Sequence, residues 1–202
     1  RPRNYLIPLL PIALKSDNRS TAAAKVSKIV LYDGPNLTGK WKEFTDNVPD
    51  LGAELFAKTV RSLKVERKPW VAYKGTRFTR DFAVYGPGEH PVLGHMDTQV
   101  QSLRLVKEEL GNPHIVLYAA VHFGEPSRDI EEDMNDLVKG GFPDLVSSHK
   151  VKQGVWILYE GLNYSGKHLI TFQGDEWADY RQLGWKDKVS SLKPFKSSGN
   201  MV

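Results

Sequence analysis

The hydrophobic residues of this chain occur in short runs that alternate with polar residues or are rich in β-branched and aromatic side chains. Residues 28–32 (KIVLY) and 155–159 (VWILY) are two such runs, and turn-forming residues follow at 33–36 and 160–163. Residues 167–172 alternate again after a glycine. Short runs separated by frequent turns are typical of antiparallel strands packed in two sheets, so the pattern predicts an all-β sandwich.

The sequence also repeats itself with an offset of 86 residues, without a gap from Tyr32 to Gly88 of the first copy. Beyond about residue 90 the offset becomes 89, so three residues were inserted in the second copy or lost from the first. Such a repeat indicates two copies of one domain. The matching pairs include Tyr32/Tyr118, Leu51/Leu137, Phe56/Phe142, Val60/Val146, Trp70/Trp156, Tyr73/Tyr159 and Gly88/Gly174.

A shorter repeat of about 40 residues lies within each copy. An aromatic residue at a strand end is followed five positions later by another large apolar residue, and each unit closes with a strand that begins with Ser. The chain therefore contains four related units. The aromatic residues are Tyr32, Tyr73, Tyr118 and Tyr159, and the closing serines are Ser62, Ser102, Ser148 and Ser191.

One segment has a different spacing. Ile130, Met134 and Leu137 are spaced as on one face of a helix. The equivalent segment of the first copy, residues 44–51, contains Pro49. A proline inside a helix costs about 3 kcal/mol or more. Since the two copies should share one backbone, we predict a short strand followed by at most one helical turn.

Together these features resemble the βγ-crystallins over about residues 27–196. The family's aromatic-x4-aromatic-x-Gly signature is kept with Gly39 and Gly166, whereas Arg80 and Glu125 occupy the glycine position of the other two units. The units are most similar to the non-lens branch, of the absent-in-melanoma and epidermal-differentiation-specific types. The resemblance implies an all-β chain of two βγ-crystallin domains, each a two-sheet sandwich of two Greek-key motifs.

The repeat and the resemblance divide the chain into five parts. Because the sequence begins with Arg rather than Met, we also expect a processed chain or a fragment. The parts are a leader or linker at 1–26, a first domain at 27–106 (Greek keys about 27–67 and 68–106), a connecting peptide at 107–113, a second domain at 114–196 (Greek keys about 114–153 and 154–196) and a tail at 197–202.

Composition limits the class and location of the protein. The chain has 202 residues, no cysteine and a net charge of +4 at pH 7. Disulfides and cysteine-bound metals are therefore excluded, and the chain fits an intracellular or a secreted location, with the cytoplasm slightly favoured. No apolar run approaches the ~18 residues of a membrane-spanning helix. The charge is positive over residues 1–106 and negative over residues 107–202.

The resemblance implies one ligand, calcium, which the family binds through an Asn/Asp-Asn/Asp-x-x-Ser/Thr-Ser motif in each unit. Calcium prefers several oxygen ligands. The two motifs of the second domain keep an acid at position two and a hydroxyl at position five. We therefore expect at most weak calcium sites there. The expected side-chain ligands are Asp144, Ser147, Asp187 and Ser190.

The motifs of the first domain are poorer. Lys58 and Arg61 would place cations where a cation must bind, and the motif that begins at Asp97 has Gln101 in place of the fifth hydroxyl. We expect no calcium site in this domain. A structural reading stays open for all four motifs, since Asp and Ser also stabilise turns.

Other candidate motifs predict no chemistry. Residues 34–40 and 161–167 have P-loop spacing but lead into predicted strands, so we interpret them as hairpin turns. His90 and His95 flank the three-residue gap without an evident third ligand. No catalytic motif is present, and no nucleic-acid motif accompanies the basic residues of the first domain, so we predict neither an enzyme nor a nucleic-acid-binding protein.

Three functions therefore remain as hypotheses. The first is a structural or scaffold module, with its domains paired within the chain or between chains of a homo-oligomer. The second is a calcium-responsive module. The third is a glycan- or membrane-targeting module of a larger protein, which in the related branch includes chains with pore-forming regions.

Overall fold

The computed structural model describes residues 26–142, 145–185 and 189–196. These residues form fourteen β-strands and three short 3-10 helices, and they contain no α-helix. The all-β prediction is therefore confirmed. No helix among these residues has the length and apolar character needed to cross a bilayer.

The first domain begins with a four-stranded antiparallel sheet in the order β2-β1-β3-β6. Three of its strands come from the first Greek-key unit, and β6 is contributed by the second unit. The pairing of β3 with β6 places Leu63 opposite His90. The strands are β1 (Lys28–Tyr32), β2 (Trp41–Phe44), β3 (Ser62–Glu66) and β6 (Gly88–His90).

The second sheet of this domain has the order β5-β4-β7, and the first unit contributes to it in return. Val48 of the first unit forms an isolated antiparallel bridge with Leu103 of β7. The two units therefore exchange their third segments, which locks one sheet to the other. The strands are β4 (Trp70–Tyr73), β5 (Phe82–Tyr85) and β7 (Ser102–Leu105), and the 3-10 helix η1 (Gly94–Met96) precedes β7.

The second domain repeats this arrangement, with sheets β13-β10-β8-β9 and β12-β11-β14. Met134 bridges Leu192 as Val48 bridges Leu103. A single bridge followed by turns thus replaces the short strand predicted after Ile130. The elements are β8 (His114–Ala120), η2 (Val121–Phe123), β9 (Gly124–Ile130), β10 (Ser148–Gln153), β11 (Val155–Tyr159), β12 (His168–Phe172), β13 (Glu176–Trp177), η3 (Tyr180–Leu183) and β14 (Ser191–Pro194).

Each domain has its own apolar core between its two sheets. Trp70 and Trp156, which are repeat-equivalent, are completely buried in the first and second core. Trp156 Nε1 donates a hydrogen bond to the Gln153 carbonyl oxygen at 3.3 Å, whereas Trp70 Nε1 is buried without an acceptor among the described residues. The two cores thus bury equivalent tryptophans, but only the indole N–H of Trp156 has a hydrogen-bond acceptor among the described residues.

The closing serine of each unit is a structural residue. Ser62 Oγ accepts a hydrogen bond from the Leu37 N–H at 2.9 Å and donates one to the Gly34 carbonyl oxygen at 2.6 Å. The last strand of the unit is thereby tied to the hairpin between its first two strands. The same pair of bonds joins Ser102 to Phe78 and Gly75, Ser148 to Phe123 and Ala120, and Ser191 to Tyr164 and Gly161.

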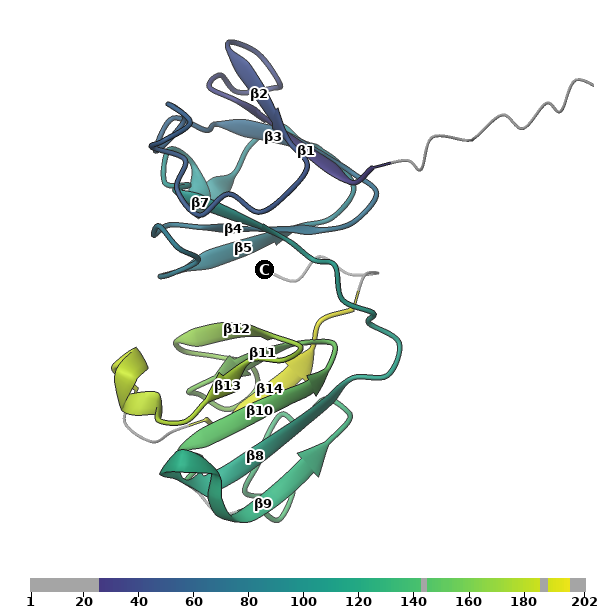
Figure 1. Cartoon of the computed structure of the whole chain (residues 1–202), viewed down its shortest axis with the longest axis vertical. Helices are drawn as coiled ribbons and strands as arrows, with labels where there is room; N and C mark the ends of the chain where they lie inside the picture. Colours follow the sequence, from purple (N-terminus) through teal and green to yellow (C-terminus); the bar gives the residue numbers. More distant parts are fainter. Residues whose placement is uncertain (1–25, 143–144, 186–188, 197–202) are drawn as a thin grey trace, which may run out of the picture.

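The two domains face each other through their second sheets (Figure 1). Strands β4 and β5 lie above β11 and β12 in this view, and a third apolar cluster takes residues from both domains. The contact follows the repeat, because Val71 and Tyr73 are equivalent to Ile157 and Tyr159. Its buried members are Val71, Tyr73, Phe82, Val106, Val155, Ile157, Tyr159, Ile170, Phe172 and Phe195.

Candidate functional site

In the first domain, the two segments at the positions of the calcium motif lie against each other. The Lys58 N–H donates to the Val100 carbonyl oxygen at 3.0 Å, and the Thr98 N–H donates to the Val60 carbonyl oxygen at 2.9 Å. Both donors have left-handed backbones, with φ of 54° at Lys58 and 58° at Thr98. These reciprocal bonds bring the two motifs together, as a shared site would require.

Arg61 introduces a permanent positive charge between these motifs. Its Nε lies 3.3 Å from Asp97 Oδ1, so the fifth position of one motif forms an ion pair with the first position of the other. The carboxylate that could have served a metal ion is thereby neutralised by a guanidinium group. The expectation that this pair of motifs does not take calcium stays a prediction, and the ion pair gives it a physical reason.

In the second domain the structure describes half of the expected ligands. Ser147 and Ser190 are buried, and their N–H groups donate to the carbonyl oxygens of Tyr118 and Tyr159, both at 2.9 Å. Neither hydroxyl makes a hydrogen bond among the described residues. Asp144 and Asp187 lie outside the described residues.

The calcium site therefore stays a prediction. Over residues 26–142, 145–185 and 189–196, no group of three or more His, Asp or Glu side chains is arranged to hold a metal ion. The two motifs of the second domain nevertheless keep serines, Ser147 and Ser190, where the first domain has Arg61 and Gln101.

Sequence reasoning missed a charged cluster between the domains. Asp81, in the hairpin between β4 and β5, lies 3.3 Å from His168 Nε2 and 3.6 Å from His95 Nε2, and 3.3 Å from Lys74 Nζ. Partial burial raises the pKa of Asp81, but hydrogen bonds from the Phe82 N–H and Lys74 outweigh this, so its pKa lies below the usual value. Only the packing of one domain on the other could bring His168 to this carboxylate.

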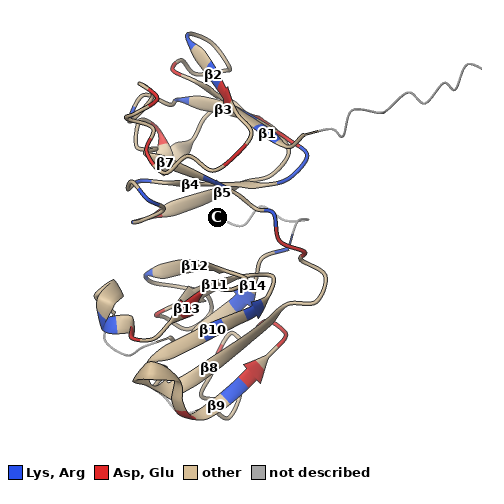
Figure 2. Cartoon of the chain, viewed as in Figure 1, with Lys and Arg blue, Asp and Glu red and all other residues tan. Residues whose placement is uncertain are grey.

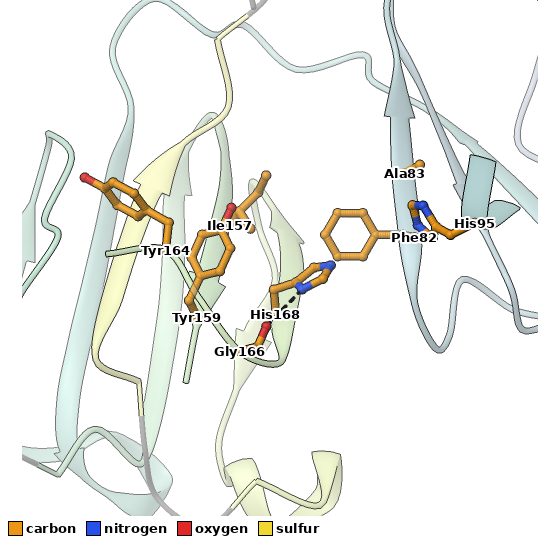
Figure 3. A pocket seen from close by; sticks show the side chains of 8 residues that line it. All are labelled: Phe82, Ala83, His95, Ile157, Tyr159, Tyr164, Gly166 and His168. Atoms are coloured by element: carbon orange, nitrogen blue, oxygen red, sulfur yellow. Dashed lines mark hydrogen bonds between the residues drawn. The ribbon is translucent and has the colours of Figure 1, made fainter. Parts of the chain in front are cut away.

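His168 also lines a small cavity of about 230 Å³ between the domains (Figure 3). Its ring meets Phe82 edge to face with centroids 4.9 Å apart, and lies 5.9 Å from the ring of Tyr159. In Figure 3 Phe82 points from the first domain towards His168, and Tyr159 and Tyr164 of the second domain lie on the other side of His168, to the left. Because aromatic walls enclose it, the cavity fits an interdomain packing gap better than a catalytic centre.

A second unexpected polar group is buried within the second domain. His149 replaces Leu63 of the first copy, and burial lowers its pKa to about 3. Its Nδ1 lies 2.5 Å from the Tyr180 hydroxyl and its Nε2 lies 3.0 Å from Thr171 Oγ1. Thr171 Oγ1 itself lies 3.4 Å from Asp175 Oδ2, to which it donates, so it accepts from the Nε2–H of a neutral imidazole. His149 is therefore a satisfied core residue rather than a catalytic base.

Each domain is a pair of Greek-key units that exchange their third segments. This arrangement places the chain in the class of crystallin-type sandwich proteins. The Beta/Gamma crystallin family model matches residues 28–106 and 114–195. The chain belongs to the βγ-crystallin family.

Similar curated proteins come from lens and non-lens sources. The epidermal differentiation-specific protein of Cynops pyrrhogaster is 31% identical and covers 88% of this chain, which spans 52% of that protein. Beta/gamma crystallin domain-containing protein 1 of Homo sapiens is 28% identical over 90% of this chain and 9% of its own length. Beta-crystallin B1 of Bos taurus is 28% identical over 76% of this chain and 65% of its own length. The similarity to the epidermal type is thus confirmed, and the chain spans about half of that relative.

Solved structures that are similar to this chain include whole and partial matches. A βγ-crystallin from Ciona intestinalis is 27% identical and covers 39% of this chain and 98% of its own, with a TM-score of 0.38. Protein S in complex with calcium is 17% identical and covers 84% of this chain and 100% of its own, with a TM-score of 0.36.

Proposed function

We propose that this chain is a non-enzymatic structural module, in which two βγ-crystallin domains are held as one body. The observation that carries the proposal is the apolar cluster shared by the two domains. Val71 and Val155 are completely buried in it, although they lie on the outer faces of their own sheets. Apolar surface removed from water stabilises a contact by about 25 cal/mol per Å², so the paired domains should resist separation.

A polar contact reinforces the apolar one. The guanidinium of Arg104, on β7 of the first domain, lies 3.6 Å from the ring centroid of Phe172 on β12 of the second. Cation–π contacts of this kind contribute about 0.5–2 kcal/mol, depending on how far they are shielded from water. Pairing within the chain is therefore the association we propose, ahead of a homo-oligomer.

Calorimetry of the whole chain tests this proposal. We expect the unmodified protein to unfold in a single transition, because each domain stabilises the other. Val71→Asp would bury a carboxylate between the domains and should split the transition in two. Val30→Asp is the matched control, since Val30 is the repeat-equivalent residue on the outer face of the first sheet, away from the contact. Two transitions in the unmodified protein would contradict the proposal.

Calcium binding by the second domain is a second proposal. It is supported by Ser147 and Ser190, which are largely buried as residues but whose hydroxyls make no hydrogen bond among the described residues. Two acids are few for calcium, so a Kd of about 10⁻⁴ M or weaker is expected. Titration with calcium should raise the melting temperature, since a ligand that binds only the folded state stabilises it.

Two double variants, each of which removes two carboxylates, test whether the expected ligands bind the calcium. Asp144→Ala with Asp187→Ala should abolish the shift, whereas Glu131→Ala with Glu132→Ala removes the same charge from the same domain and should preserve it. A melting temperature that millimolar calcium leaves unchanged would eliminate this second proposal.

A targeting role within a larger chain is supported by one exposed patch. Trp41 is 63% exposed and Leu55 is 90% exposed, and both line a shallow hollow with Lys40. An exposed Trp and Leu beside a cation suit a glycan or the surface of a membrane. Sedimentation with anionic vesicles and binding to a glycan array, each compared with Trp41→Ala, would test the idea. Equal binding by the variant would count against it.

A further inference from the structure

A groove of about 480 Å³ lies between the two domains and is separate from the calcium motifs. One wall is the hairpin between β4 and β5, residues 74–81, and the other runs through residues 175–183 of the second domain. Its size falls in the range of pockets that bind small organic molecules, and such pockets are frequent at domain interfaces.

The floor of the groove is aromatic. Tyr73, Phe82 and Phe172 line it and are almost completely buried, with the rings of Tyr73 and Phe82 6.1 Å apart. The guanidinium carbon of Arg104 lies 3.6 Å from the ring centroid of Phe172 and 5.9 Å from that of Phe78. The floor therefore offers the small accessible part of these rings, next to a delocalised cation, as an apolar surface against which a flat apolar group can pack.

The rim of the groove is positively charged. Arg77 and Arg80 line it and are exposed, and no carboxylate of the described residues lies within ion-pair distance of either. Figure 2 shows Lys and Arg in this hairpin, at the side of the space between the domains.

The acids of the opposite wall have partners already. Asp175 Oδ2 accepts hydrogen bonds from the Phe172 N–H at 2.8 Å and from Thr171 Oγ1 at 3.4 Å. Glu176 lies 3.5 Å from Lys150 Nζ. Glu176 is thus paired with a lysine, whereas Asp175 is bonded only by uncharged donors of the described residues and keeps its negative charge, and neither lies within ion-pair distance of the two arginines of the rim.

The backbone that carries these arginines is held firmly. The Arg77 N–H donates to the Pro49 carbonyl oxygen at 2.7 Å, and the Phe78 N–H donates to Ser102 Oγ at 3.0 Å. Ser102 Oγ in turn donates to the Gly75 carbonyl oxygen at 2.6 Å. A rigid hairpin reduces the loss of conformational freedom when a ligand binds.

We propose that this groove binds a small amphipathic organic anion. The flat apolar body of the ligand packs against the aromatic floor, and its carboxylate or sulfonate accepts hydrogen bonds from Arg77 and Arg80. Guanidinium groups suit planar or tetrahedral oxyanions because they donate in pairs. This binding function goes beyond the structural and calcium roles. It rests on the proposed domain pairing, because the groove lies between the domains, and the calorimetric transition reports that pairing independently of ligand binding.

Two dyes with the same ring system distinguish the contribution of the ligand's negative charge to binding from that of its apolar rings. The probes are 1-anilinonaphthalene-8-sulfonate and N-phenyl-1-naphthylamine, which has the same rings without the sulfonate. Fluorescence titration of the whole folded chain should give at least about tenfold tighter binding of the sulfonate, as expected for charge-assisted hydrogen bonds. Equal affinity for the two dyes, or no binding of the sulfonate, overturns the proposal.

A pair of double variants locates the binding. Arg77→Gln with Arg80→Gln should remove the preference for the sulfonate and leave the weaker binding of the neutral dye unchanged. Arg67→Gln with Lys152→Gln removes two exposed charges that do not line the groove and should keep the preference. Melting curves of both variants establish that they fold. A sulfonate preference that survives the first pair, or is lost equally in the second, overturns the assignment to this groove.

Discussion

Ser102 Oγ donates a 2.6 Å hydrogen bond to the carbonyl oxygen of Gly75, which is 27 residues earlier in the chain and lies in the hairpin of the same unit. The serine is completely buried, so water cannot replace it. The same bond recurs in all four units, including those whose motifs carry Arg61 or Gln101 in place of a calcium-binding hydroxyl. The closing serine therefore belongs to the fold rather than to a metal site.

Ser102→Ala should destabilise the protein by about 2 kcal/mol, because it leaves both the Gly75 carbonyl and the Phe78 N–H without partners. Urea unfolding followed by circular dichroism measures the change. Thr79→Ala is a suitable control, since its hydroxyl makes one exposed hydrogen bond to the Thr76 carbonyl oxygen within the same hairpin. We expect the control to cost less than half as much, and a reversed order would refute the structural role of the serine.

Arg80→Gly should stabilise the first domain by about 1 kcal/mol. Arg80 has a φ of 66°, at the position where two other units have Gly39 (φ 85°) and Gly166 (φ 79°). A left-handed backbone is strained for residues with a Cβ and free for glycine. The reciprocal change, Gly166→Ala, has room for the Cβ and should cost a similar amount. Thermal melts of both variants measure the effect, and destabilisation by Arg80→Gly would show that the strain is not relevant.

His149 should make the second domain sensitive to mild acid. Burial lowers its pKa to about 3, whereas its pKa in the unfolded chain is near 6.5. The unfolded state therefore binds the proton first, and stability present above pH 6.5 is lost as the pH falls towards 3. Between pH 7.5 and 5.0 the loss from this residue is about 2 kcal/mol. Urea unfolding at the two pH values should show a smaller loss in His149→Gln than in the unmodified protein, and equal losses would disprove the assignment.

The two buried tryptophans should respond differently to the same substitution. Trp156→Phe removes the donor to the Gln153 carbonyl oxygen, whereas Trp70→Phe removes an indole N–H that has no acceptor. Both changes leave a cavity, but only Trp70→Phe relieves a buried unsatisfied donor, which costs about 1–3 kcal/mol. We expect Trp70→Phe to be the milder variant by at least about 1 kcal/mol in urea unfolding. An equal or larger loss would mean that Trp70 Nε1 is satisfied in solution.

Local pattern determined much of the fold in advance. The predicted strands at 28–32 and 155–159 coincide with β1 and β11, and the four closing serines each begin a strand. Alternation and β-branched residues report on a single strand, and the repeat transfers that information from one unit to the next. The family signature has Arg80 in place of its glycine, but the backbone at Arg80 keeps the left-handed conformation that the glycine has in two other units.

Long-range pairing was decided by the tertiary structure alone. The exchange of Gly88–His90 into the first sheet, the ion pair of Arg61 with Asp97 and the approach of His168 to Asp81 all join segments that are far apart in the sequence. Periodicity says which face of a strand is apolar but not which other surface covers it, and charge counts say nothing of how side chains pair. The amino-acid sequence by itself thus determined four Greek-key units in two domains, whereas the packing of domain on domain created the aromatic groove and its arginine rim.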